Sequence, residues 1–290
     1  MNISRIVIAL LTAALILFTA GCGGKDGPDT PESRDRLVVA VTIVPEKTFV
    51  KEVCGDLAEV VTMVPPGYSP ENYEPAAPQM EKFYDAAVYF TIGVPAEEAN
   101  ILPAAKDVRV VPLHEAASRV YDELEFEDGG RDPHVWLSPR RVMIMIDAIA
   151  ETMCDIDPSN EQVYRENAAG YIRRLDELDK RIRSSLEGVR SRKIVVYHPA
   201  FGYFADDYGI EMLALEEEGK EATAGRLQEV IDIAREENIK VVFYQEEMHS
   251  GQAEAIAEEI GGKTVKLSPL AEDYTGNLEE MASLLAEVLQ

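Results

Sequence analysis

Eight short apolar runs recur along the chain, and they constrain its fold more than any other feature. They are LVVAVTI (37–43), AEVVTMV (58–64), AAVYFTI (86–92), VRVVPL (108–113), KIVVYH (193–198), GIEMLAL (209–215), KVVFYQ (240–245) and KTVKLS (263–268). Most are nearly continuous in apolar residues and are separated by helical patterns, which is typical of parallel strands buried on both faces. We therefore predict an α/β fold of two lobes, each a roughly four-stranded parallel sheet flanked by helices.

One long helix is predicted between the two groups of strands. Apolar residues recur there at spacings of three and four: Tyr164, Ala168, Tyr171, Leu175, Leu178, Ile182 and Leu186. They form a single stripe, and a helix from 160 to 187 would be about 40 Å long. We accordingly divide this part of the chain into an N-terminal lobe (37–157), a linking long helix (158–190) and a C-terminal lobe (191–290). A single rigid helix between lobes predicts limited domain closure.

The first 22 residues have the pattern of a secretory signal. Arg5 precedes an apolar run from Ile6 to Phe18, which is too short to span a bilayer of about 30 Å. Small residues precede Cys22, an end that resembles the processing site of lipoproteins, in which the thiol is acylated. We expect Cys22 to anchor the protein to the outer face of the cell membrane through a flexible linker (23–36), with ordinary signal cleavage as the alternative.

The formal net charge of −25 excludes a nucleic-acid partner, because phosphate binding needs a basic surface. An acidic surface instead raises the local concentration of cations. Besides Cys22, the chain contains only Cys54 and Cys154. These two thiols could pair in an oxidising compartment or remain buried and free, and the sequence leaves both possibilities open.

The segment DPHVWLSP places His134 between two prolines. Proline fixes its own φ angle and biases the residue before it towards extended geometry, so this backbone has little freedom. Ser138 and Pro139 are then predicted as the N-cap and first residue of a helix that runs towards Cys154. A rigid loop of this kind suits a metal ligand or a base, and it also suits a plain turn.

Further candidate residues follow predicted strands. Ligands of open parallel sheets collect beyond the carboxyl ends of the strands, and in the C-terminal lobe those positions hold His198, Gln245 and Ser268. In the N-terminal lobe, the loop PPGYSPENYEP (65–75) follows the second strand and carries Glu71. Two histidines and a carboxylate on loops that could converge between lobes predict a metal site.

Four ordered segments resemble those of the zinc and manganese ABC-transporter solute-binding lipoproteins. They are PGYSPENYEP, DPHVWLSP, YHPAFGYFADDYGI and VFYQEEMHSGQAEAIAEEIGGKTVKLSPL. The resemblance covers residues 37–290. It implies two lobes of parallel sheet joined by one long rigid helix, with the metal held in the cleft by three histidines and a carboxylate or by two of each. By this resemblance His134 matches the histidine of the DPH motif, and His198 matches the histidine that opens HPAFGY.

This chain departs from the family pattern at two positions. Glu71 stands where the family often has a histidine, and Ser268 stands where an aspartate commonly opens the last loop. The histidine-rich loop found ahead of DPH in many zinc members is absent, and the acidic DELEFEDGG takes its place. We therefore expect His134, His198 and Glu71 to be three protein ligands, with water, an anion or Gln245 in the fourth position.

The residues near Gln245 leave that fourth position open. Glu246, Glu247 and His249 are close to it in sequence and could replace it, and the sequence does not rank them. The family pattern puts no ligand at His249, which we interpret as a surface histidine at the start of a helix. We expect a structural role for His114 at the end of a strand.

Together with the metal-like cluster, this resemblance implies an extracytoplasmic solute-binding protein that captures one divalent ion and delivers it to an ABC permease. We expect a monomer and zinc as its ion, because two imidazoles with one carboxylate suit zinc slightly better than manganese, the alternative ion. No HExxH or GxSxG motif is present, so we expect no enzymatic activity and disfavour a zinc hydrolase. The other alternative is a tethered, adhesin-like protein that has lost the metal. Protons should compete with the metal below the usual histidine pKa of about 6.5.

Overall fold

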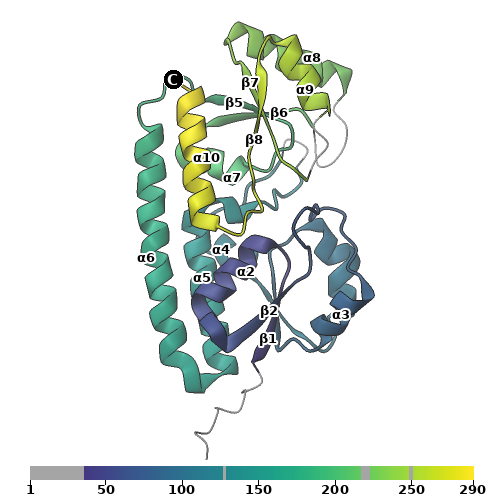
Figure 1. Cartoon of the computed structure of the whole chain (residues 1–290), viewed down its shortest axis with the longest axis vertical. Helices are drawn as coiled ribbons and strands as arrows, with labels where there is room; N and C mark the ends of the chain where they lie inside the picture. The colour runs from purple at the N-terminus through teal and green to yellow at the C-terminus, as the bar shows by residue number, and fades with distance from the viewer. Residues whose placement is uncertain (1–35, 127–128, 217–222, 248–250) are drawn as a thin grey trace, which may run out of the picture. The chain divides into compact units, whose positions relative to one another are not determined.

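The computed structural model describes residues 36–126, 129–216, 223–247 and 251–290, and these contain two four-stranded sheets (Figure 1). The first, in the N-lobe, has the order β2-β1-β3-β4 and is built from β1 (Leu37–Val41), β2 (Ala58–Thr62), β3 (Val88–Thr91) and β4 (Arg109–Pro112). The second, in the C-lobe, has the order β6-β5-β7-β8 and is built from β5 (Lys193–Val196), β6 (Glu211–Ala214), β7 (Val241–Tyr244) and β8 (Lys263–Lys266). All neighbouring strands are parallel, so the predicted fold class is confirmed.

Helices flank both sheets. The N-lobe contains α2 (Val44–Cys54), α3 (Ala77–Tyr84), α4 (Leu113–Ser118) and α5 (Pro139–Ile156), with short turns η1 (Gly55–Leu57), η2 (Glu97–Ile101), η3 (Leu102–Ala104) and η4 (Val135–Leu137). Another short turn, η5 (Pro158–Asn160), leads into the long helix. The C-lobe contains α7 (Gly202–Tyr208), α8 (Ala224–Glu236), α9 (Gly251–Glu259) and α10 (Tyr274–Val288). Both lobes belong to one unit, Leu37–Gln290. The signal segment and Cys22 lie outside the described residues.

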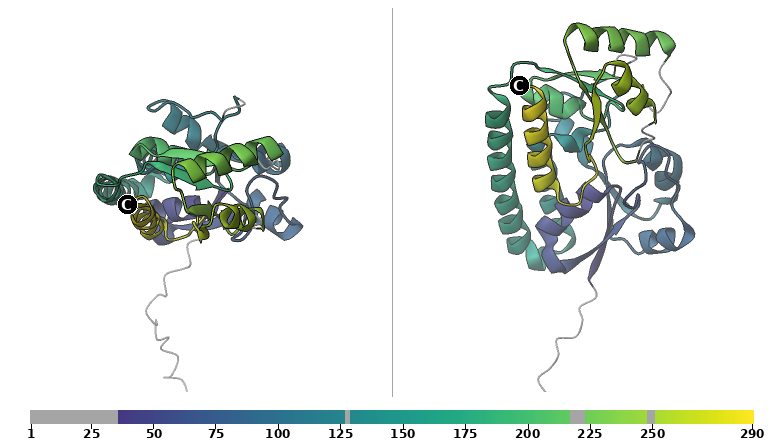
Figure 2. Two further views of the ribbon diagram at one scale, coloured as in Figure 1. Left: turned by 90° about the horizontal axis from the view of Figure 1, so that it is seen from above. Right: turned by 45° about the horizontal axis from the view of Figure 1, so that its top comes forward.

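The long helix α6 (Glu161–Leu186) lies between the two sheets in the sequence, as predicted. All seven residues of its predicted apolar stripe are buried. The stripe packs against α2, α5 and α10, and Figure 2 shows α6 and α10 side by side along much of their length. Burial of one continuous face explains why so long a helix with so many charged residues on its other faces is stable here.

The first strand ends two residues earlier than its apolar run. The helix α2 starts at Val44, with Pro45 in its first turn, and the buried side chain of Glu46 folds back over the turn. Its Oε2 accepts hydrogen bonds from the backbone N–H groups of Thr42 and Ile43, each at 3.0 Å. Proline is favoured at the start of a helix and a carboxylate there satisfies free N–H groups, so this local chemistry ends the strand.

The sequence did not indicate a second connection between the lobes, which follows β8. The chain that leaves β8 returns to the N-lobe, where the indole Nε1 of Trp136 donates to the carbonyl of Pro269 at 2.8 Å. The Tyr274 hydroxyl donates to the Trp136 carbonyl at 2.7 Å, and the Tyr274 ring packs edge-on against Phe49 at 5.0 Å between centroids. Residues of both lobes consequently share one hydrophobic core.

Cys54 and Cys154 are buried free thiols. Burial, with a smaller contribution from Asp157, raises the pKa of Cys54 to about 12, so this thiol is protonated at neutral pH. Among the described residues, no helix combines the length and the apolar character that crossing a membrane requires.

Candidate metal centre

His134 lies on a loop fixed by its own neighbours. Asp132 Oδ1 accepts hydrogen bonds from the His134 backbone N–H and from its ring Nδ1, both at 2.8 Å. Ser138 caps α5 as predicted, since its Oγ accepts from the backbone N–H of Arg141 at 3.2 Å and Pro139 is the first residue of the helix. The same Oγ donates to the buried Asp207 of the C-lobe at 2.6 Å, so the loop is tied to both lobes.

His198 follows β5 and is almost fully buried, with 3% of its surface exposed. Its Nδ1 is hydrogen-bonded to the carboxylate of Glu216. Its Nε2 faces the opposite way, 2.8 Å from Glu71 Oε1 and 3.2 Å from His134 Nε2. The ring therefore has a carboxylate at each nitrogen.

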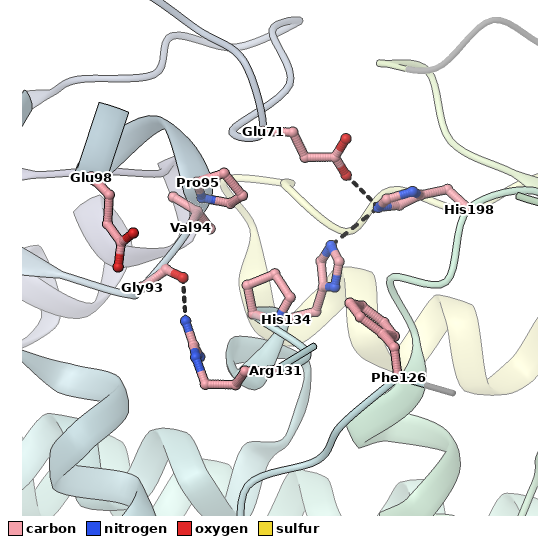
Figure 3. A pocket seen from close by; sticks show the side chains of 10 residues that line it. Glu71, Gly93, Val94, Pro95, Glu98, Phe126, Arg131, His134 and His198 are labelled. Atoms are coloured by element: carbon pink, nitrogen blue, oxygen red, sulfur yellow. Dashed lines mark hydrogen bonds and ion pairs between the residues drawn. The ribbon is translucent and has the colours of Figure 1, made fainter. Parts of the chain in front are cut away.

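The structure brings Glu71, His134 and His198 together, although they are remote in sequence (Figure 3). One ligand atom from each lies within 4.8 Å of the others. Glu71 extends from the loop between β2 and α3, and both histidines are buried. A cavity of about 330 Å³ borders this cluster and is also lined by Gly93, Glu98 and Arg131 among others. Two imidazole nitrogens and one carboxylate oxygen at such distances suit a zinc ion with an additional ligand.

Opposite charges in the cluster shift the pKa values of both His198 and Glu71. Burial alone would lower the pKa of His198, but the hydrogen bonds and charges of Glu216 and Glu71 outweigh it and raise this pKa to about 9. Burial alone would raise the pKa of Glu71, but the hydrogen bond to His198 and the two imidazoles lower it. In the metal-free protein the raised pKa of His198 thus favours a proton on its ring, and a divalent cation would supply the positive charge instead.

Gln245 lies beside this cluster and Glu247 is close to it. Both line a small second cavity together with Glu71, His134 and His198. Gln245 is buried, and neither its Oε1 nor the Oε2 of Glu247 has a hydrogen-bond partner among the described residues. Burial raises the pKa of Glu247. Buried oxygens without a partner are costly, so this cavity offers acceptors for a cation or a water.

The described residues at the remaining predicted positions have other partners or lie outside the cluster. Glu246 is exposed and pairs with Lys266 at 2.9 Å. Ser268 is half-buried, and its carbonyl accepts from the Asn277 side chain at 2.7 Å. His249 lies outside the described residues. The remaining histidine, His114, lies in the first turn of α4 near Arg131 and is not in the cluster.

Two carboxylates beside the histidines were not predicted as parts of the site. Asp132 belongs to the DPH segment, where the prolines indicate only a restricted backbone and give no role to its side chain. Glu216 directly follows the predicted run 209–215, so the rule that selected His198 at a strand end would also have selected Glu216.

A two-lobed α/β protein with an imidazole and carboxylate cluster where the lobes meet has the architecture of a solute-binding protein. The family model described as zinc-uptake complex component A, periplasmic, matches residues 39–288, and the chain belongs to this family.

Individual relatives agree with this assignment. The zinc-binding lipoprotein AdcA of Streptococcus pneumoniae strain R6 is 29% identical over 282 residues, which are 91% of this chain and 55% of AdcA. The chain therefore spans about half the length of AdcA. The manganese-binding lipoprotein MntA of Halalkalibacterium halodurans is 26% identical over 264 residues, 89% of this chain and 86% of MntA. A crystal structure of ZnuA superimposes with a TM-score of 0.82 at 32% identity, covering 88% of this chain and all of ZnuA.

Proposed function

We propose that this protein captures one zinc ion between its lobes and delivers it to an ABC permease. One observation carries the proposal: the buried Nε2 atoms of His134 and His198 and a Glu71 oxygen converge within 4.8 Å. Membership of the zinc-uptake family and the similarity to ZnuA and AdcA support zinc as the ion. The similarity to MntA keeps manganese as the alternative ion.

In this proposal His134 and His198 bind the ion through Nε2, and Glu71 binds it through a carboxylate oxygen. Gln245 lines the same small cavity, and its Oε1 has no hydrogen-bond partner among the described residues, so we propose it as the fourth ligand or the acceptor for a bound water. Three protein ligands and one exchangeable position allow both tight capture and release. The function requires no chemical step, and we propose that the protein is not an enzyme.

We also propose that acylated Cys22 holds the monomeric protein on the outer face of the membrane, near the permease. The naming of AdcA and MntA as lipoproteins supports this anchor. Incorporation of a labelled fatty acid into the wild type and its absence from Cys22→Ala would agree with the anchor. Equal labelling of both proteins would contradict it.

The experiment for the metal site is calorimetric titration of chelator-stripped protein with zinc and with manganese. We expect one zinc per chain with a Kd below about 1 μM, which corresponds to about −8 kcal/mol. His134→Ala and His198→Ala should each weaken zinc affinity by more than about 100-fold. Loss of a residue that only hydrogen-bonds a metal ligand typically costs no more than about 100-fold. His114→Gln removes an imidazole outside the cluster and should bind as the wild type does. Tighter binding of manganese than of zinc would contradict zinc as the ion. Unchanged zinc affinity in His198→Ala would contradict the proposed site.

A further inference from the structure

Glu216 is a buried carboxylate of the C-lobe beside His198, and only 3% of its surface is exposed. It lies two residues beyond the end of β6. Its backbone N–H donates to the Tyr197 carbonyl at 3.0 Å, and the preceding Leu215 N–H donates to the Val196 carbonyl at 2.9 Å. The β5–β6 pairing thus continues past the named strands and fixes the backbone of Glu216 beside that of His198.

The side chain of Glu216 contacts His198 on the side away from the proposed metal position. It is hydrogen-bonded to Nδ1, whereas Nε2 faces Glu71 and His134. Asp132 makes the corresponding contact with His134, from Oδ1 to Nδ1 at 2.8 Å. Each imidazole therefore has a buried carboxylate at Nδ1 and presents Nε2 to the other imidazole.

A carboxylate in this position fixes both the orientation and the tautomer of a ligand histidine. An ionised carboxylate can only accept a hydrogen bond, so it requires a proton on Nδ1 and leaves the Nε2 lone pair for the metal. Burial of a charged group is costly unless it is hydrogen-bonded. Glu216 is buried beside His198, and its backbone is hydrogen-bonded to Tyr197, the residue before that histidine. The fold itself therefore places the carboxylate at Nδ1.

We propose that Glu216 is a positioning residue for zinc binding, which holds His198 with Nδ1–H towards its carboxylate and Nε2 towards the ion. This inference rests on the proposed function, because it assigns a role beside the proposed ligand His198. Glu216 itself does not contact the ion. Its effect passes through the orientation and basicity of the imidazole.

The test compares Glu216→Gln and Glu216→Ala with a matched control, Glu211→Gln. Glu211 lies on β6, five residues earlier, and its side chain is 61% exposed and pairs with Lys193. Glutamine keeps an oxygen that can accept from Nδ1–H but removes the charge, whereas alanine removes both. Zinc affinity by chelator competition should fall about tenfold in Glu216→Gln and towards 100-fold in Glu216→Ala. The control should bind as the wild type does.

Two further readouts separate positioning from a purely structural role. Nitrogen-15 NMR of zinc-loaded protein should show His198 bound through Nε2 with Nδ1 protonated in the wild type and in Glu216→Gln, and this single state should be lost in Glu216→Ala. Urea unfolding of the metal-free variants measures stability separately. If Glu216→Ala lowered stability while zinc affinity and the His198 tautomer stayed as in the wild type, the inference would be overturned.

The same measurements distinguish failure of the proposed metal site from failure of the role proposed for Glu216. If the wild type bound no zinc, or if His198→Ala left binding unchanged, both the proposed function and this inference would fall. If the wild type bound zinc through His198 and the alanine variant at Glu216 matched it, only the inference would fall.

Discussion

Zinc binding should depend on pH well above the range expected for an ordinary histidine. The carboxylates of Glu216 and Glu71 raise the pKa of His198 to about 9 against the opposing effect of burial. A raised pKa means that the protonated ring is stabilised in the metal-free protein, and zinc must displace that proton from Nε2. Affinity therefore falls as pH drops through the whole range below 9, rather than only below the usual histidine value of about 6.5.

The magnitude follows from the fraction of His198 that is protonated. With a pKa of about 9, about 97% of the rings carry the proton at pH 7.5, whereas a pKa of about 6.5 would leave about 10% protonated. Zinc binding at pH 7.5 should then release about one proton from His198. Between pH 8 and pH 6, affinity should fall about tenfold per unit, or about 100-fold in total. The lowered pKa of Glu71 keeps that carboxylate ionised over this range, so it adds no proton.

Calorimetry in two buffers that do not bind zinc and differ in ionisation enthalpy measures the number of protons released. The titration repeated at pH 6, 7 and 8 gives the slope of affinity against pH. Release of about 0.1 proton at pH 7.5, with constant affinity between pH 7 and pH 8, would refute the raised pKa. The same hydrogen bonds stabilise the metal-free fold below about pH 6.5, and this contribution is lost as pH rises through about 9.

Two further substitutions act away from the ion. A Cβ at Gly202 would collide with Asp132 Oδ2, so Gly202→Ala should displace the carboxylate that orients His134. Zinc affinity measured by chelator competition should then fall about tenfold. An affinity equal to that of the wild type would contradict the role of Asp132. Tyr274→Phe removes the donor to the Trp136 carbonyl, and loss of this buried hydrogen bond should lower the free energy of unfolding by about 1–2 kcal/mol. Urea unfolding of the metal-free protein measures that loss, and an unchanged midpoint would show that the bond between the lobes does not contribute.

Much of the fold could be predicted because its signals are local. The buried face of α6 follows from one apolar stripe, and the cap of α5 follows from Ser138 and Pro139. Strand ends were less accurate, as at β1, because Glu46 folds back onto the turn after the strand. The return of the chain to the N-lobe through Tyr274 could not be predicted, since a single side chain that packs across lobes leaves no periodic pattern in the sequence.

The candidate site, like the fold, could be predicted only in part. His134 and His198 could be selected because proline restricts one loop and a strand end places the other residue. The distance between them depends on how the lobes pack, and no spacing in the sequence encodes it. Glu216 was missed although it follows a strand, because a run of glutamates looks like a solvated surface. Gln245 and Glu247 could not be ranked, because the bend of their loop decides which oxygen faces the cavity.

Anomalous diffraction at the zinc edge, from crystals of the zinc-loaded protein, would locate the ion that we propose to lie between His134, His198 and Glu71. We expect a single strong peak about 2.0–2.1 Å from both Nε2 atoms and about 2.0–2.2 Å from a Glu71 oxygen. A peak at other residues, or no ordered peak in protein that has bound one equivalent of zinc, would contradict it.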